Sequence, residues 1–279
     1  MSLRLTKRLA ALAEPLDGVA DPVQGAVRAV PKPVRDVLDG VWLGSPLHPA
    51  LTDVPLGAWT TAAALDLAGS RAADDALAVG VLGAVPAALT GLNDWSHLRG
   101  DSKRVGTVHA LVNTMGLALN VASIFARRDG RRGLGKALSG VAYAAALFSA
   151  HLGGQLSFGF GVRVNRTAFE SPRERYAPVC EEEELDRGKL CRVDLEGDAV
   201  LVARSEETGE PCAIAATCSH LGGPLDKGSR EGDSVVCPWH GSRFDLCTGE
   251  VEGGPAVFPQ PRYEARLRAG KVEIRAAKD

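Results

Sequence analysis

Cysteine is absent from the first 179 residues, and all six cysteines lie in the last hundred residues. None of them pairs at a short, disulfide-like spacing, which favours a reducing compartment. The chain also lacks a basic stripe with interleaved aromatic residues, and its formal net charge is only -2. Nucleic acid is therefore excluded as a partner. The amino-terminal stretch has neither an apolar signal core nor a twin-arginine pair, so we expect no cleavable leader.

Charged residues are missing from three long apolar stretches, residues 76-92, 105-126 and 137-158. A fourth stretch, residues 54-69, contains only Asp66 as a charge. A bilayer core is crossed by roughly 20 helical residues, so the pattern predicts an all-α four-helix transmembrane bundle. A soluble bundle is the alternative because the stretches are rich in Ala and Gly, but soluble helices of this length normally carry a charged face.

Basic residues near the ends of the four stretches indicate the topology. With the amino terminus in the cytoplasm, ten such residues fall on the inner side and six on the outer side. The positive-inside rule then predicts a multi-pass protein of the inner (plasma) membrane with both termini in the cytoplasm. The basic loop at residues 127-136 argues the other way.

Four histidines share one end of this expected bundle: His48, His97, His109 and His151. They could ligate haem or a metal, or hydrogen-bond a quinone. The alternative is that they cap helix ends. Asp66 either pairs with a polar group of the bundle or marks an early end of its helix.

The second half of the chain changes character. Short runs with apolar residues at period two predict antiparallel strands at residues 189-195, 199-205, 212-217, 234-239, 263-270 and 271-276. We therefore divide the chain into an amphipathic or interfacial segment (1-47), a four-helix membrane domain (48-160), a charged linker (161-176) and an all-β domain (177-279).

Two Gly- and Pro-rich loops of the β-domain carry metal-ligand residue types. One contains Cys218-Ser-His220 and the other Cys237-Pro-Trp-His240. Zinc sites usually group like ligands, whereas here each loop contributes one Cys and one His. This mixed pairing matches a two-iron cluster in which one iron takes both cysteines and the other takes both histidines.

The stretches "CSHLGGPL" and "CPWHGSRFD" resemble the Rieske [2Fe-2S] family, over about residues 176-277. The resemblance implies that Cys218, His220, Cys237 and His240 bind the cluster and that electrons leave through the two histidines. It also implies a surrounding layer of residues, which are Leu221, Gly222, Pro224, Trp239, Ser242, Phe244 and Pro255.

The chain departs from the family pattern at three positions. Respiratory members carry an extra cysteine in each loop, joined in a disulfide, but Gly223 and Trp239 stand there. Phe244 replaces a tyrosine that donates a hydrogen bond to the cluster, so we expect a potential in the lower or middle part of the family range of about -150 to +300 mV. The other cysteines, which are Cys180, Cys191, Cys212 and Cys247, are expected to be free thiols.

No catalytic set accompanies the cluster motif. A dinucleotide fingerprint is missing, and the chain has no large domain for the mononuclear iron site of an oxygenase. We therefore expect an electron carrier or a component of an oxidoreductase rather than a stand-alone enzyme.

The stretch "HPALTDVPLGAW", residues 48-59, resembles an uncharacterised four-helix bacterial membrane family. Together the two resemblances imply a protein anchored in membrane lipid, with its Rieske domain in the cytoplasm. It would pass single electrons between a cytoplasmic partner, such as a reductase or oxygenase, and a membrane redox site or protein. The alternatives are a cluster-based redox sensor or scaffold, and a quinone-linked oxidoreductase that uses the histidine end of the bundle.

Overall fold

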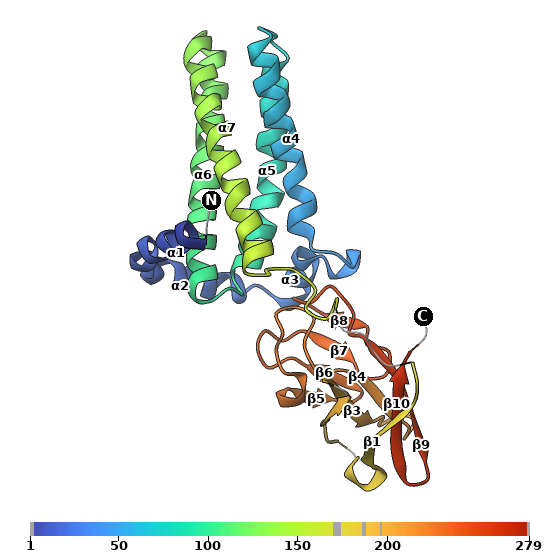
Figure 1. The fold of residues 1–279 in the computed structure, drawn as a ribbon. Helices are drawn as coiled ribbons and strands as arrows, with labels where there is room; N and C mark the ends of the chain where they lie inside the picture. The colour runs from blue at the N-terminus through green and yellow to red at the C-terminus, as the bar shows by residue number, and fades with distance from the viewer. Residues whose placement is uncertain (1–2, 170–173, 186–187, 196, 278–279) are drawn as a thin grey trace. The chain divides into compact units, whose positions relative to one another are not determined.

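The computed structural model describes residues 3-169, 174-185, 188-195 and 197-277. Its contacts divide the chain into two compact units, Met1–Val34 with Pro46–Val162, and Arg35–Ser45 with Arg163–Asp279. The first unit is helical and the second is mostly β (Figure 1). The expected all-α plus all-β layout is therefore confirmed. Residues 170-173 of the expected linker, including Arg173 of the basic-residue count, lie outside the described residues.

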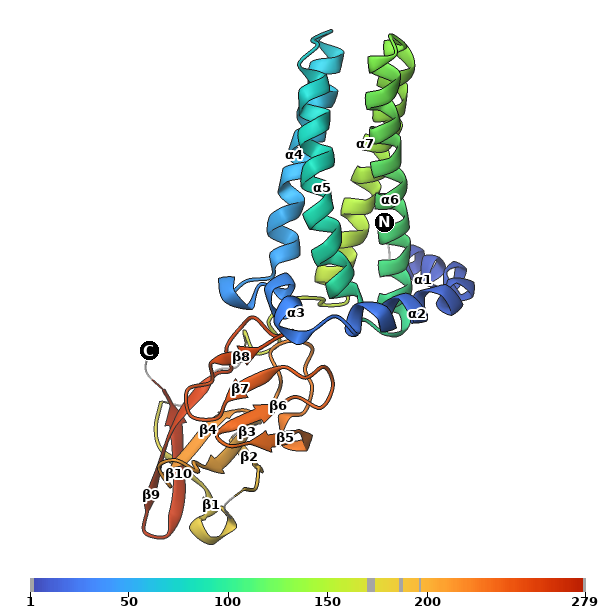
Figure 2. The same ribbon diagram turned by 180° about the vertical axis from the view of Figure 1, so that it is seen from behind.

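Four long helices form the body of the first unit: α4 (Leu47–Leu67), α5 (Ala73–Trp95), α6 (Gly100–Arg128) and α7 (Arg132–Gly154). A π-helical turn, η3 (Gln155–Gly159), extends α7. Opposite views show two hairpins, α4 beside α5 and α6 beside α7 (Figures 1 and 2). The helices α5, α6 and α7 with its extension are long and apolar enough to cross a membrane.

The amino-terminal helices α1 (Leu3–Leu12) and α2 (Asp17–Arg28), joined by the turn η1 (Glu14–Leu16), pack against one end of this bundle. Lys103 Nζ, in the first turn of α6, lies 2.9 Å from carboxylate oxygens of both Asp17 and Asp21. The Gln24 amide donates to the backbone oxygen of Trp95 at 2.8 Å. These contacts attach the short helices to the ends of α5 and α6.

The two hairpins are repeats of one another, which the sequence analysis did not detect. Each of the six buried residues of α7 lies 62 positions after a buried residue of α5: Gly135, Ser139, Ala142, Ala146, Ser149 and Leu152 correspond to Ala73, Leu77, Gly80, Ala84, Ala87 and Thr90. On α4 and α6 the offset is 61, and Pro55, Trp59 and Ala62 correspond to Gly116, Asn120 and Ser123. Few of these pairs are identical, so the repeat lies in the burial pattern. Two parallel hairpin repeats imply a pseudo-two-fold axis along the bundle.

Asp66 pairs with Arg127, which occupies the equivalent position of the other hairpin. The Arg127 guanidinium donates to Asp66 and to Asp74, each at 2.9 Å, and its side chain is 2% exposed. An unpaired charge at this depth would be expensive, so the pair holds the two hairpins together at this end. Of the two alternatives for Asp66, the structure supports the role of a partner.

The second unit contains a six-stranded and a four-stranded antiparallel sheet. The larger has the order β1-β10-β9-β4-β3-β2, built from β1 (Ala177–Glu181), β2 (Cys191–Leu195), β3 (Asp198–Arg204), β4 (Pro211–Ala215), β9 (Arg262–Arg268) and β10 (Lys271–Ala276). The smaller follows chain order, with β5 (Ser229–Glu231), β6 (Ser234–Val236), β7 (Arg243–Asp245) and β8 (Val251–Gly253). The sequence pattern did not predict β1, β5, β7 and β8. Of these, β5, β7 and β8 have only three residues each, too few to display a period of two.

Short helical pieces complete this unit: the end of α3 (Lys32–Asp39), η2 (Val41–Leu43), η4 (Glu182–Glu184) and η5 (Leu225–Lys227). Residues 35-45 belong to it although they precede the bundle in the chain.

Cys212 and Cys247 form a disulfide, with their Cα atoms 4.6 Å apart, so the expectation of free thiols is wrong for this pair. Residues 35 positions apart become neighbours only when β4 lies beside the turn after β7, and spacing alone does not reveal such a pairing. A loop of this length contributes about 4 kcal/mol of stability in the chain-entropy model. The disulfide also removes the cysteine argument for a reducing compartment.

Cys180 and Cys191 are free thiols. Burial raises the pKa of Cys180 to about 11, with a further contribution from the neighbouring Cys191. Thiols of this kind are almost entirely protonated at neutral pH, so we assign them no reactive role.

Candidate metal centre

The first cysteine–histidine loop follows β4 and is closed by its own backbone. The Cys218 N–H donates to the oxygen of Gly223 at 2.8 Å, and the Gly222 N–H donates back to the oxygen of Cys218 at 2.9 Å. Gly222 has a φ of +79°, a left-handed conformation that favours glycine. Pro224 forms a bridge with Thr217 where the loop closes.

The second loop connects β6 to β7 and has the same geometry. The Cys237 N–H donates to the oxygen of Ser242 at 2.8 Å, and the Gly241 N–H donates to the oxygen of Cys237 at 3.0 Å. Gly241 has a φ of +76°, at the position equivalent to Gly222. The two loops are therefore two copies of one turn, each beginning with a cysteine.

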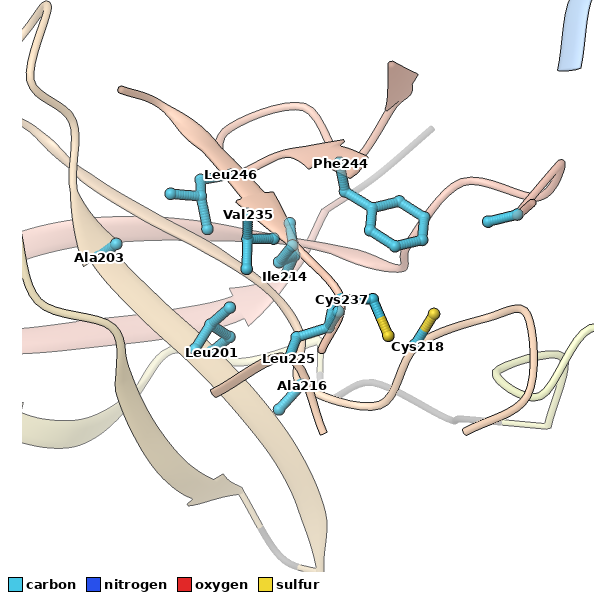
Figure 3. Packing of buried hydrophobic residues seen from close by; sticks show 11 residues of the cluster. Leu201, Ala203, Ile214, Ala216, Cys218, Leu225, Val235, Cys237, Phe244 and Leu246 are labelled. Carbon is cyan, nitrogen blue, oxygen red and sulfur yellow. The ribbon is translucent and has the colours of Figure 1, made fainter. Parts of the chain in front are cut away.

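The sulfur atoms of the two loops face one another in the protein interior (Figure 3). Cys218 is 0% and Cys237 3% exposed, and both belong to the cluster of buried residues that includes Phe244. Backbone N–H groups of His220 and Leu221 donate to the Cys218 sulfur, and those of Trp239 and His240 donate to the Cys237 sulfur. Each turn thus aims two donors at its own sulfur, an arrangement that stabilises thiolate.

The contact between the two sulfur atoms shifts the pKa values of the two thiols in opposite directions. A hydrogen bond from Cys218 lowers the pKa of Cys237 to about 7. The same hydrogen bond and burial raise the pKa of Cys218 above its ordinary value. The two thiols together therefore readily carry one negative charge near neutral pH. A bound positive metal would favour loss of the second thiol proton as well.

The two histidines also meet. The ring centroids of His220 and His240 are 5.2 Å apart, and the rings are nearly perpendicular. His240 is half-buried, whereas His220 is 7% exposed. His220 is more enclosed than expected because Arg163, Pro255 and Phe258 line the small depression beside it.

The four side chains therefore lie as a cysteine pair and a histidine pair. Among the described residues, no three His, Cys, Asp or Glu side chains converge as they would around a single metal ion. A two-iron cluster with two protein ligands on each iron needs only such pairs. The donor set fits that cluster.

Gly223 and Trp239, which replace the cysteines of respiratory family members, pack together. A Cβ on Gly223 would lie 2.8 Å from the Cys237 sulfur and 3.2 Å from the Trp239 ring. A side chain at position 223 would therefore displace the sulfur. Trp239 is 49% exposed, so its ring covers the loop from the solvent side.

Ser242 and Phe244 follow the second loop and are both fully buried. The Ser242 hydroxyl oxygen accepts a hydrogen bond from the Ala256 N–H at 3.0 Å. The Ser242 hydroxyl proton therefore does not point at Ala256. It can be donated to another acceptor, as a hydrogen bond to a bridging sulfide of the cluster would require. Phe244 offers no donor.

A buried ion pair, which the sequence analysis missed, supports the Pro-rich segment at residues 253-263. Arg163 donates to the oxygen of Pro255 at 2.6 Å and to the Asp39 carboxylate at 2.9 Å. The Gly254 N–H donates to the Asp36 carboxylate at 2.9 Å. The side chains of Arg163 and Asp39 are only 6% and 2% exposed. No local motif connects residues 124 positions apart, so only folding reveals this pair.

Two family models match the chain. Residues 175-264 match the Rieske [2Fe-2S] domain, and residues 44-166 match a family described as predicted membrane proteins (DUF2231). The expected resemblances of both halves are thereby confirmed, and with them a [2Fe-2S] cluster in the β-domain.

Relatives are similar to the β-domain. Ferredoxin CarAc of Metapseudomonas resinovorans is 31% identical over 101 residues, which are 36% of this chain and 92% of that protein. Apoptosis-inducing factor 3 of Mus musculus is 35% identical over 102 residues, 37% of this chain but only 16% of that protein. In a solved structure, the ferredoxin of carbazole 1,9a-dioxygenase from Nocardioides aromaticivorans IC177 is 29% identical, with 39% of this chain and 100% of that chain covered and a TM-score of 0.34.

The buried pair of Asp39 and Arg163 yields a prediction. Asp39→Ala leaves the Arg163 charge buried without its carboxylate, so we expect the β unit to lose about 3 kcal/mol of unfolding free energy. Denaturant unfolding of the full chain in detergent, followed by Trp fluorescence and circular dichroism, measures the change. The control is Asp129→Ala, because Asp129 forms an ion pair with Arg131 in which both side chains are more than 60% exposed. Equal effects of the two substitutions would contradict the proposed support.

Proposed function

Because the chain belongs to the Rieske [2Fe-2S] family, we propose that it is a membrane-anchored carrier of single electrons. The observation that carries the proposal is the pair of matching turns, each of which presents one cysteine and one histidine. The similarity to a ferredoxin over 92% of that protein's length supports a carrier.

We assign one iron to Cys218 and Cys237 and the other to His220 and His240. When bound, a cluster of this type takes up and releases one electron. The residues of the chain would do the rest: the four backbone N–H groups stabilise charge on the cysteine sulfurs, and the buried cluster of apolar residues excludes water from that side. His240, which is half-buried, is the better exit for the electron.

The ligand assignment is tested by single substitutions. Cys218→Ser, His220→Ala, Cys237→Ser and His240→Ala should each reduce bound iron and acid-labile sulfide at least about tenfold, since each removes one of only two ligands to an iron. Cys191→Ser is the control and should retain two irons and two sulfides per chain, because Cys191 lies outside the loops. A full cluster in any of the four ligand variants would disprove that assignment.

Phe244 supplies a second test, through the reduction potential. Phe244→Tyr would introduce a hydroxyl where the family has a cluster donor, and a donor favours the more negative reduced state. One hydrogen bond of about 0.5-1.5 kcal/mol corresponds to a rise of roughly 20-65 mV for one electron. Protein-film voltammetry measures the shift, and Ser242→Ala should shift the potential in the opposite direction. An unchanged or lower potential in Phe244→Tyr would contradict this role.

We further propose that α4 to α7 span the plasma membrane as a multi-pass anchor in lipid. Three of these segments have the required length and composition, and residues 44-166 match a predicted membrane family. The excess of basic residues supports a cytoplasmic position of the Rieske domain. The Cys212–Cys247 disulfide argues against it, because such bonds are rare in a reducing cytosol.

A reporter fused after Asp279 separates these two arguments. With the Rieske domain in the cytoplasm, a fused green fluorescent protein should fluoresce and a fused alkaline phosphatase should be inactive. The opposite pattern would place the domain on the outer face and make the disulfide the better guide to topology.

The partner on the Rieske side is proposed to be a reductase or oxygenase protein, since a relative that is 31% identical over 86% of its own length is the ferredoxin component of a naphthalene 1,2-dioxygenase system. On the membrane side we propose a redox site or a second membrane protein. If the chain were instead a redox sensor, it would show no electron-transfer turnover with a reductase or oxygenase. If it were a quinone-linked oxidoreductase, it would reduce a quinone in the absence of a second membrane protein.

A further inference from the structure

His48 and His109 occupy equivalent positions of the two hairpin repeats. They are 61 residues apart, the same offset that relates the buried residues of α4 to those of α6. The same offset relates Asp66 to Arg127. These two residues contact each other near the carboxyl ends of α4 and α6, whereas the histidines lie toward the other end of the bundle. The repeat therefore has a charged pair at one end and a histidine pair at the other.

Each of these histidines is held in the same way. The Nδ1 atom of His48 lies 2.8 Å from the backbone oxygen of Ala87, and that of His109 lies 2.9 Å from the backbone oxygen of Ser149. Ala87 and Ser149 are themselves equivalent in the repeat. A carbonyl oxygen only accepts, so in both histidines Nδ1 carries the proton and the lone pair is on Nε2.

A glycine lies beside each of the two rings. A Cβ on Gly91 would lie 2.6 Å from the His48 ring, too close to be accommodated, and one on Gly153 would lie in ordinary van der Waals contact with the His109 ring, at 3.5 Å. These two glycines are also separated by the repeat distance of 62 residues. The imidazoles therefore pack against equivalent positions of α5 and α7, and at His48 the contact requires glycine.

The fixed tautomer narrows the choice of ligands that the sequence left open. A histidine whose Nε2 carries the lone pair can ligate a metal or accept a hydrogen bond from a quinol hydroxyl, but it cannot donate from that nitrogen to the oxygen of an oxidised quinone. The Asn113 amide donates to His109 Nε2 at 3.1 Å, which agrees with a lone pair there. A hydrogen bond from Nδ1–H to a backbone carbonyl is also the usual support of a metal-ligating histidine.

The number of ligands decides which kind of metal group fits. Within the described part of the chain, no third His, Cys, Asp or Glu joins the two histidines in a metal-binding group. A bare ion would lack ligands, whereas a haem brings four nitrogens and needs only two axial ligands from the protein. The apolar helices around the pair suit such a macrocycle.

We propose that His48 and His109 are the axial ligands of one haem on the pseudo-two-fold axis of the bundle, with Asn113 turning away from Nε2 on binding. The inference deepens the proposed function and rests on it, because the haem would be the membrane redox site that exchanges electrons through the bundle. His151 takes no part: it lies two residues beyond Ser149, on a different face of α7.

The experiment is a titration of the purified full chain in detergent with hemin, followed by optical and low-temperature EPR spectra. One hemin per chain should bind with the low-spin spectrum of two imidazole ligands. His48→Ala and His109→Ala should each weaken binding at least about tenfold, and to a similar extent, because the two positions are equivalent. His151→Ala is the matched control and should bind as the unmodified chain does.

The variant His109→Met distinguishes loss of the ligand from failure of the chain to fold. A folded chain with this substitution should bind hemin with a histidine–methionine spectrum and a higher haem potential. The inference is overturned by the absence of stoichiometric low-spin binding in the unmodified chain, or by unchanged spectra in the His48 and His109 variants. Iron and sulfide analysis of the same samples reports on the Rieske cluster separately, so failure of the haem does not count against the carrier.

Discussion

The contact between the sulfur atoms of Cys218 and Cys237 is the interaction on which the β unit is organised. Two buried thiols are brought together by two copies of one turn, and each turn directs its own backbone N–H groups at its sulfur. Because these donors belong to the backbone, they depend on the left-handed glycines of the turns and not on the identity of neighbouring side chains. The histidines then follow at fixed positions after each cysteine and meet on the other side of the site.

Two further contacts of the β unit stabilise the segments next to these turns. The Cys212–Cys247 disulfide joins the strand that leads into the first turn to the residues that follow the second. In respiratory family members a disulfide joins the two loops directly, whereas here the disulfide joins the segments that flank the loops. The ion pair of Asp39 and Arg163 fixes the Pro-rich segment beside His220. Residues from the amino-terminal part of the chain thereby take part in a site that the carboxy-terminal motif defines.

Much of this could be predicted from local patterns. Charge-free stretches predicted the long helices, alternation predicted the longer strands, and the Cys-x-His and Cys-x-x-His spacing predicted the cluster family. The features that were missed depend on contacts between residues distant in the sequence. These are the Cys212–Cys247 disulfide, the Asp39–Arg163 pair and the identity of Arg127 as the partner of Asp66. The hairpin repeat escaped detection for another reason: equivalent positions such as Trp59 and Asn120 share burial but not chemistry.

The most direct test of the central claim is electron–nuclear double resonance on the dithionite-reduced full chain, with histidine labelled with nitrogen-15. The account predicts the EPR signal of a reduced [2Fe-2S] centre with couplings to two labelled histidine nitrogens. A reduced centre without histidine couplings would mean that four other ligands hold the irons, and the two turns would then not be the cluster site.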